Sequence, residues 1–281
     1  MNKFSNLKDI GVHMSNSKVV VITGVSSGIG QITAEKFAKL GHKVFGTVRN
    51  KVKAQPIEGV EFVEMDVSDE DSVQRGIHFI IEQAGHIDIL VNNAGASLIG
   101  AVEETSIKEA EFLFNTNVFS ILRTTQAVLP YMRIQHYGKI INVSSVLGFL
   151  PSPYMGLYSA TKHAVEGLSE SLDHELRQFG IRVSIVQPSF TKTNLDKNAP
   201  IVSSKIPEYD NERNLATQAV LNQIDHAPQP DGVADTIVKA ALNDWQMRLT
   251  PSGQASLLSK LRRFMPSGPV DKNIRKTFGL K

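Results

Sequence analysis

Short apolar runs alternate with longer amphipathic segments along most of the chain. The runs are rich in valine and isoleucine, and several are almost wholly apolar, as expected of strands covered on both faces. The longer segments repeat apolar residues at helical spacing, and the segment at 30–40 is followed by Gly41, a typical helix end. This alternation predicts βαβ units and a parallel sheet. The predicted strands are 19–22, 43–48, 60–65, 87–91, 138–143, 182–186 and a short seventh at 247–250.

The segment at 191–229 departs from this rhythm. It is polar and carries Pro200, Pro207 and Pro228. Because it follows the sixth predicted strand, it would lie over the carboxyl ends of the strands, where open α/β sheets bind ligands. We therefore predict a helical lid over a substrate site. Four charged residues of this segment could equally form a solvated face: Lys205, Glu208, Asp210 and Arg213.

One domain accounts for all of these elements. We expect a Rossmann-type, doubly wound parallel sheet of about seven strands in a single three-layer α/β/α domain over 18–258. Residues 1–17 form an N-terminal extension. Residues 259–281 form a basic C-terminal tail, expected to be a solvated helix and extended end rather than a membrane- or anion-binding patch. The predicted helices are 30–40, 69–84, 106–135 with a bend near Pro130, and 154–179.

Composition and charge narrow the function classes. The 281 residues are 41% hydrophobic and 21% charged, which is ordinary for a globular protein. The net charge is only +2, so nothing demands a nucleic-acid partner. The chain has no cysteine, which excludes disulfides, thiolate catalysis and cysteine-ligated metals. It shows neither a secretory signal nor an apolar run of about 18 residues, so we expect a cytoplasmic protein without stable membrane insertion. We also expect no metal site.

A glycine-rich turn follows the first predicted strand and precedes a helix. Glycines let the chain reverse with positive φ and let its backbone approach a pyrophosphate, while the helix N-terminus directs N–H groups at the phosphates. The spacing G-x-x-x-G-x-G differs from the common G-x-G-x-x-G, and an ordinary βα turn is the alternative. The position of the turn favours nucleotide binding by Thr23, Gly24, Ser26, Ser27, Gly28, Ile29 and Gly30.

The end of the second strand bears on the choice of cofactor. No carboxylate that could hold a ribose 2′-hydroxyl follows Val48, whereas Arg49 can bind a 2′-phosphate through charge-assisted hydrogen bonds. A solvated basic loop is the alternative interpretation. We therefore favour NADP(H), with NAD(H) as the second candidate.

Tyr158 and Lys162 are four residues apart and share one face of a predicted helix. A free phenol has a pKa near ~10. A nearby ammonium lowers this pKa, so the tyrosine could act as a general acid or base. Alone, the pair could be an ordinary surface feature. Ser144 and Ser145 follow one strand and Asn92–Gly95 follow another, so polar groups converge at the carboxyl ends of the sheet.

Together these motifs resemble the short-chain dehydrogenase/reductase family, in its compact single-domain branch, over about 18–193. The resemblance implies a catalytic tetrad of Asn117, Ser145, Tyr158 and Lys162, with Ser145 chosen over Ser144 because it lies thirteen residues before Tyr158. Ser189 and Thr191 replace the family's usual glycine and valine or isoleucine. Besides the glycine turn and Arg49, the implied cofactor contacts are Asp66, Val67, Asn93, Ala94, Gly95, Tyr158, Lys162, Pro188, Ser189, Thr191 and Thr193.

The resemblance also implies a mechanism. It is a reversible hydride transfer between nicotinamide C4 and a carbonyl carbon, in which Tyr158 exchanges the proton and Ser145 binds the carbonyl oxygen. Lys162 lowers the pKa of the tyrosine and binds the nicotinamide ribose, and Asn117 holds a water of a proton relay. The chain would then be an NADP-dependent enzyme acting on CH–OH groups.

The residues expected to line the substrate pocket are mostly apolar, which suggests a hydrophobic ketone or aldehyde and its alcohol as substrates. Within the family, the glycine turn and the end of the second strand weakly resemble 17β-hydroxysteroid and retinol dehydrogenase-like members. The helices at 106–135 and 154–179 resemble those that pair subunits, which implies a homodimer or homotetramer. The expected substrate residues are Leu147, Phe149, Tyr154, Met155 and Phe190.

Three alternatives remain open at this point. A nucleotide-sugar epimerase or dehydratase would have another glycine spacing and a larger C-terminal part. An enoyl reductase would space its tyrosine and lysine further apart. A non-catalytic redox sensor that binds NADP(H) would need no proton donor, whereas this chain carries all four catalytic residue types.

Overall fold

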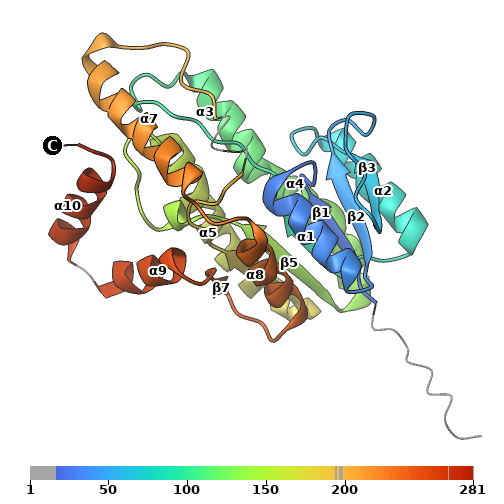
Figure 1. Cartoon of the computed structure of the whole chain (residues 1–281). Coiled ribbons are helices and arrows are strands. Elements are labelled where there is room, and N and C mark those ends of the chain that lie inside the picture. Colours follow the sequence, from blue (N-terminus) through green and yellow to red (C-terminus); the bar gives the residue numbers. More distant parts are fainter. Residues whose placement is uncertain (1–16, 194, 196–198, 265, 281) are drawn as a thin grey trace, which may run out of the picture.

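The computed structural model describes residues 17–193, 195, 199–264 and 266–280, so nearly all of the N-terminal extension lies outside the described residues. It contains a seven-stranded sheet in the order β3-β2-β1-β4-β5-β6-β7, with every neighbouring pair parallel. This confirms the predicted doubly wound fold (Figure 1). The strands are β1 Val19–Thr23, β2 Lys43–Val48, β3 Val60–Glu64, β4 Ile89–Asn92, β5 Gly138–Val143, β6 Ile181–Val186 and β7 Arg248–Leu249.

Helices cover both faces of the sheet, which explains why several of its strands are almost wholly apolar. In β1, Val20 and Ile22 pack in one buried cluster with Phe37, while Val19 and Val21 pack in another on the opposite face. Each fully buried aliphatic side chain stabilises the fold by about 1.5–3 kcal/mol. The first face is covered by α1 Gly28–Lys39 and α8 Asp231–Leu242, and the second by α2 Glu70–Ala84, α4 Ser120–Gln135 and α5 Gly156–Leu176.

The helix predicted at 106–135 is interrupted by a π-helical turn. A capping box of Ser106 and Glu109 starts α3, Ile107–Phe114, and a π-helical turn at Asn115–Phe119 joins it to α4. Pro130 lies within α4, which continues through it, so the predicted bend there stays a prediction. A π-helical turn carries one extra residue and is found frequently at functional sites.

Further helices lie beyond β6. The predicted lid contains a short 3-10 turn, η4 Pro207–Tyr209, followed by α7 Asp210–Asp225. The C-terminal segment forms α9 Gln254–Phe264 and α10 Ser267–Thr277 rather than a solvated end. Phe278 is 6% exposed and packs in the same cluster as Val220 and Ile224 of α7, so α10 lies beside the lid. Among the described residues, no helix is both long and apolar enough to cross a membrane.

Candidate active site

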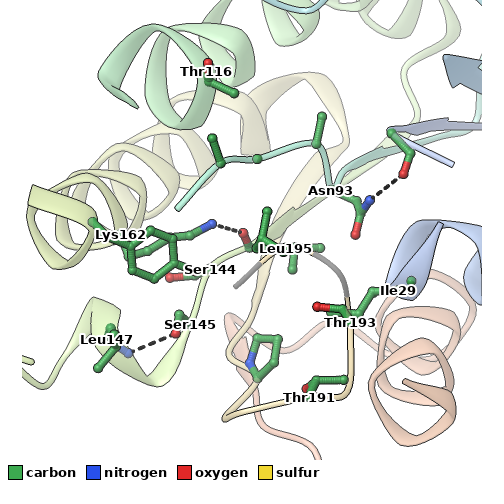
Figure 2. A pocket seen from close by; sticks show the side chains of 18 of the residues that line it. Ile29, Asn93, Thr116, Ser144, Ser145, Leu147, Lys162, Thr191, Thr193 and Leu195 are labelled. Carbon is green, nitrogen blue, oxygen red and sulfur yellow. Dashed lines mark hydrogen bonds between the residues drawn. The ribbon is translucent and has the colours of Figure 1, made fainter. Parts of the chain in front are cut away.

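A cavity of about 540 Å³ opens at the carboxyl ends of the strands. Its lining comes from the turns after β1, β2, β4, β5 and β6, as a doubly wound sheet predicts. One end is lined by the glycine turn and Arg49, and the other by apolar side chains. Figure 2 shows Ile29 of the turn and Leu147 among the residues that line the cavity. Of the predicted site residues, 21 line it: Gly24, Ser26, Ser27, Gly28, Ile29, Arg49, Asp66, Val67, Asn93, Ala94, Gly95, Ser145, Leu147, Met155, Tyr158, Lys162, Pro188, Ser189, Phe190, Thr191 and Thr193.

The glycine turn forms a cradle that side chains would fill. Gly24 and Gly28 have φ of 72° and 63°, the left-handed region that favours glycine. A Cβ on Gly30 would lie 2.3 Å from the Gly24 carbonyl oxygen, so only glycine fits. Ser27 precedes α1 and makes no side-chain cap, which leaves the first helical N–H groups directed at the cavity. This geometry fits a pyrophosphate.

Thr23 and Gly30 do not line the cavity but hold its wall in place. The Thr23 hydroxyl accepts hydrogen bonds from the Asn93 and Ala94 N–H groups, both at 3.0 Å. The Asn93 side chain donates back to the Thr23 and Gly24 carbonyls at 2.9 and 3.1 Å. These bonds tie the turn after β1 to the turn after β4, so the two nucleotide-facing turns are fixed relative to each other.

Asp66 and Arg49 lie at the same end of the cavity. Burial raises the pKa of Asp66, but hydrogen bonds from Ser68 and the charges of Arg49 and Arg123 outweigh it and hold the pKa below its usual value. The Asp66 carboxylate accepts from the Ser68 hydroxyl at 2.6 Å and the Ser68 N–H at 2.9 Å. Asp66 is therefore an anion at neutral pH, and the exposed Arg49 is available to a ligand in the cavity.

Tyr158 and Lys162 are buried on the first turns of α5 and both reach the cavity. The Lys162 Nζ donates to the Val143 carbonyl at 3.0 Å and lies 5.6 Å from the centroid of the Tyr158 ring. Ser145 lies opposite, and its Oγ accepts the Leu147 N–H at 3.1 Å, which caps a 3-10 turn at Val146–Gly148. The structure thus brings a hydroxyl, a phenol and an ammonium to one place.

The two neighbouring serines differ in accessibility. Ser144 Oγ is closed to solvent and has no hydrogen-bond partner among the described residues. It faces Gly148 and Glu166, since a Cβ on Gly148 would lie 2.7 Å from Ser144 Oγ and 2.9 Å from Glu166 Oε1. Ser145 is therefore the serine whose hydroxyl a molecule in the cavity can meet.

Asn117 lies behind the cavity, in the π-helical turn. Its Oδ1 accepts the Ala96 N–H at 2.7 Å, and its Nδ2 donates to the Ala96 carbonyl at 2.9 Å and the Thr161 hydroxyl at 3.1 Å. The side chain therefore joins the loop after β4 to α5. The predicted water-holding role of Asn117 stays a prediction.

The apolar end of the cavity differs from the predicted substrate set. Phe149 and Tyr154 do not line it. Tyr154 has φ of 58° and turns its hydroxyl to Glu212 of α7 at 3.3 Å. Sequence reasoning missed the contribution of α9 and α10, whose apolar residues were hidden within a segment read by its charge. The additional lining residues include Leu150, Pro151, Leu195, Leu258, Asn273, Ile274, Thr277 and Phe278.

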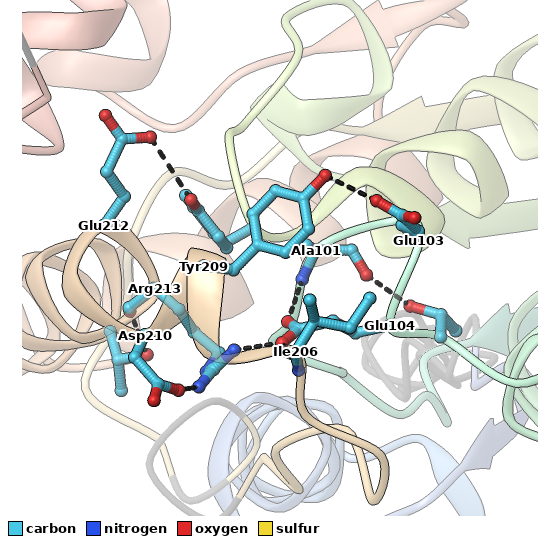
Figure 3. Close-up of polar contacts among 11 residues, drawn as sticks. Ala101, Glu103, Glu104, Ile206, Tyr209, Asp210, Glu212 and Arg213 are labelled. Atoms are coloured by element: carbon cyan, nitrogen blue, oxygen red, sulfur yellow. Dashed lines mark hydrogen bonds and ion pairs between the residues drawn. The ribbon is translucent and has the colours of Figure 1, made fainter.

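A buried ion pair fastens the lid to the body of the protein (Figure 3). The Glu104 carboxylate pairs with Arg213 of α7 and accepts the Ala101 and Ile206 N–H groups at 3.0 and 2.8 Å. Arg213 also pairs with Asp210 and is only 3% exposed, so it is not part of a solvated face.

Residues 18–201 match the model of a family described as short chain dehydrogenase. The chain belongs to the short-chain dehydrogenase family. It is therefore an oxidoreductase of this family, as the motifs at the cavity led us to expect.

Relatives extend this likeness over most of the chain. A 3-ketodihydrosphingosine reductase of Bacteroides thetaiotaomicron is 42% identical over 66% of this chain and 68% of its own. The uncharacterized oxidoreductase YusZ of Bacillus subtilis is 32% identical over 88% of this chain and 93% of its own. A solved short-chain dehydrogenase from Streptomyces avermitilis is 34% identical, with a TM-score of 0.78 over 94% of this chain and 95% of its own.

Two further solved structures carry different nicotinamide cofactors. A Burkholderia phymatum enzyme in complex with NAD is 27% identical, with a TM-score of 0.74 over 88% of this chain and 92% of its own. ElxO with NADP bound is 29% identical, with a TM-score of 0.67 over 84% of this chain and 97% of its own. Members of this fold therefore bind either dinucleotide, and the family alone does not decide between them.

Proposed function

We propose that this oxidoreductase uses NADP(H) to interconvert a hydrophobic ketone or aldehyde and its alcohol. The observation that carries the proposal is the convergence of Ser145, Tyr158 and Lys162 on one cavity with a glycine cradle at one end and apolar walls at the other. The cradle fits a dinucleotide pyrophosphate, and the apolar end fits the substrate.

The mechanism follows from what these side chains can donate. When bound, the nicotinamide ring supplies or takes up the hydride. Because Ser145 Oγ already accepts the Leu147 N–H, its own proton is left to donate to the carbonyl oxygen of the substrate. Tyr158 gives the proton that turns the developing alkoxide into an alcohol. In the oxidising direction it takes that proton back.

Lys162 supports Tyr158 electrostatically. Its ammonium is anchored on the Val143 carbonyl and stabilises negative charge on the phenol oxygen, which lies on the same helix face. An ammonium carries three protons, so Lys162 can bind a ribose hydroxyl as well. Asn117 fixes the loop after β4, which lines the cavity, to the helix that carries Tyr158 and Lys162, and so acts on the geometry of both.

The proposal is tested by following nicotinamide absorbance with purified protein, NADPH or NADH, and a panel of ketones and aldehydes of increasing chain length. We expect oxidation of NADPH well above that of NADH, with kcat/KM rising as the apolar part of the substrate lengthens. Faster turnover of small polar carbonyls would contradict the assignment of the apolar end.

Arg49 is expected to select the cofactor. Arg49→Ala should lower kcat/KM for NADPH by roughly 10- to 100-fold, because a hydrogen bond to a charged group contributes about 1.5–3 kcal/mol. With NADH the change should stay within about threefold, since the 2′-hydroxyl carries no charge for Arg49 to bind. The matched control is Arg75→Ala, which removes an exposed arginine on α2 outside the cavity. Equal losses with both cofactors would show that Arg49 does not select between them.

We also propose that the protein assembles through α3 and α4. Ile107, Phe112 and Phe119 are 74%, 56% and 47% exposed and line one apolar groove, and Leu122, 40% exposed, follows Phe119 one turn along the helix. A patch of this kind marks an interface. Ile107→Asp with Leu122→Asp should convert a dimer or tetramer into monomer in sedimentation experiments, whereas Ile134→Asp, at an equally apolar but 81% exposed position of α4 outside this patch, should not. Monomeric unaltered protein would contradict the proposal.

A further inference from the structure

The two C-terminal helices both line the apolar end of the cavity. Leu258 of α9 and Ile274 of α10 line it, together with the buried Phe278. Asn273 and Thr277 also line it while being exposed, so they lie at its mouth. Part of the mouth of the cavity therefore lies at α10, with Leu258 of α9 beside it.

The outer surface of α9 is apolar next to this mouth. Leu257 and Leu261 are four residues apart and share one helix face, yet they are 57% and 41% exposed. The inner face of the same helix is already used by Ala255 and Leu258. The helix is thus apolar on two sides, and only one of them is covered by the domain.

Positive charge is concentrated in the same C-terminal segment. Exposed residues here include Arg262 of α9 and Lys272 and Lys276 of α10. Between 254 and 280 the sequence contains a single acid, Asp271, although the whole chain is nearly neutral at +2. The rest of the chain is therefore net negative, and the positive charge is concentrated at this end. The cations of the segment are Lys260, Arg262, Arg263, Lys272, Arg275 and Lys276.

We propose that α9 and α10 dock on an anionic lipid surface and that the cavity takes its substrate from that surface. Helices that lie on membranes combine two features. Their apolar side chains enter the membrane interface, and their cations bind the anionic lipid headgroups. A protein partner would explain the charge but not the apolar end of the cavity that both helices line. The docking would place the mouth of the cavity at α10 against the bilayer, so the substrate class becomes a long-chain lipid carbonyl or alcohol. This last step rests on the proposed function, whereas the docking itself does not.

The test uses the full-length protein and sedimentation with vesicles of phosphatidylcholine alone or with phosphatidylserine added. We expect binding to the mixed vesicles at least tenfold tighter than to phosphatidylcholine alone. Raising the salt from about 0.05 M to about 0.5 M should release the protein, because screening shortens the reach of its charges. Equal binding to both vesicle types, or binding to neither, would overturn the docking.

Two variants separate the apolar and the electrostatic contributions. Leu257→Ser with Leu261→Ser, and separately Lys272→Glu with Lys276→Glu, should each lower vesicle binding at least tenfold. The matched controls are Leu242→Ser, an exposed leucine of α8, and Lys51→Glu with Lys53→Glu, exposed lysines outside the cavity. Unchanged thermal unfolding confirms that each variant is folded. Wild-type binding in the helix variants, or equal losses in the controls, would overturn the docking surface.

Turnover distinguishes this inference from the proposed function. With a short water-soluble ketone, the helix variants should keep the wild-type rate, because none of the four residues lines the cavity. With a long-chain ketone embedded in phosphatidylserine vesicles, their rate should fall at least tenfold. Vesicle binding without any carbonyl turnover would contradict the proposed function and leave the docking standing. Helix variants that keep the wild-type rate on the vesicle-embedded ketone would contradict delivery of the substrate from the lipid surface.

Discussion

Replacing Tyr158 with phenylalanine is expected to lower kcat for carbonyl reduction by roughly 10³-fold, within the range that a positioned proton donor contributes. The ring, which is 6% exposed and packs beside Met155, would keep its contacts. The variant loses only the phenol oxygen, so the developing alkoxide has no proton to take from α5. The dissociation constant of NADPH, measured by fluorescence titration, should stay within about threefold, because the cradle at Gly24–Gly30 is untouched.

A matched tyrosine separates this effect from a general one. Tyr137 precedes β5, at the end of the sheet away from the cavity, and its ring packs under Lys18. Tyr137→Phe should leave both kcat and NADPH affinity at wild-type values. A Tyr158→Phe enzyme that retains more than a tenth of the wild-type kcat would contradict the assigned proton donor.

Replacing Glu104 with alanine is expected to lower the free energy of unfolding by about 3–5 kcal/mol, because it leaves the Arg213 guanidinium buried without its main counter-charge. The Ala101 and Ile206 N–H groups would lose their acceptor as well. For a chain of this size the loss corresponds to a fall in Tm of roughly 6–20 °C. KM for a long-chain substrate should rise, since the same carboxylate holds the start of α7.

The neighbouring Glu103 provides the control. It accepts the Tyr209 hydroxyl at 2.7 Å, but at the surface, where such a contact contributes about 0–1 kcal/mol. Glu103→Gln should therefore shift Tm by no more than a few degrees. In a double-mutant cycle, Glu104→Ala combined with Arg213→Ala should cost less than the sum of the two single losses. Additive losses would show that the two side chains do not act as a pair.

Most of the fold could be predicted because its determinants are local in the sequence. A strand buried on both faces needs nearly continuous apolar residues, and β1 and β4 have them. The glycine turn and the helix face shared by Tyr158 and Lys162 are local as well. Their meeting in one cavity follows from parallel strands that all end at the same edge of the sheet.

Features that depend on contacts between residues far apart in the chain could not be predicted from the sequence. The π-helical turn lets Asn117 hydrogen-bond to Ala96, and no residue spacing within the helix predicts this contact. Arg213 looks like a solvated residue until Glu104, far away in the chain, is folded against it. Tyr154 appeared to be a pocket residue by its type alone, but its backbone turns it toward α7. The C-terminal segment was judged by its charge, which concealed the apolar spacing of Ile274 and Phe278.

The transfer of hydride within this cavity is the central claim, and labelled cofactor tests it most directly. The protein would be incubated with a hydrophobic ketone and NADPH that carries deuterium at both C4 positions, and the alcohol product analysed by mass spectrometry. We predict one deuterium per product molecule, bound to the carbinol carbon. An alcohol formed without deuterium, or NADPH bound with no alcohol formed from any ketone, would contradict the account.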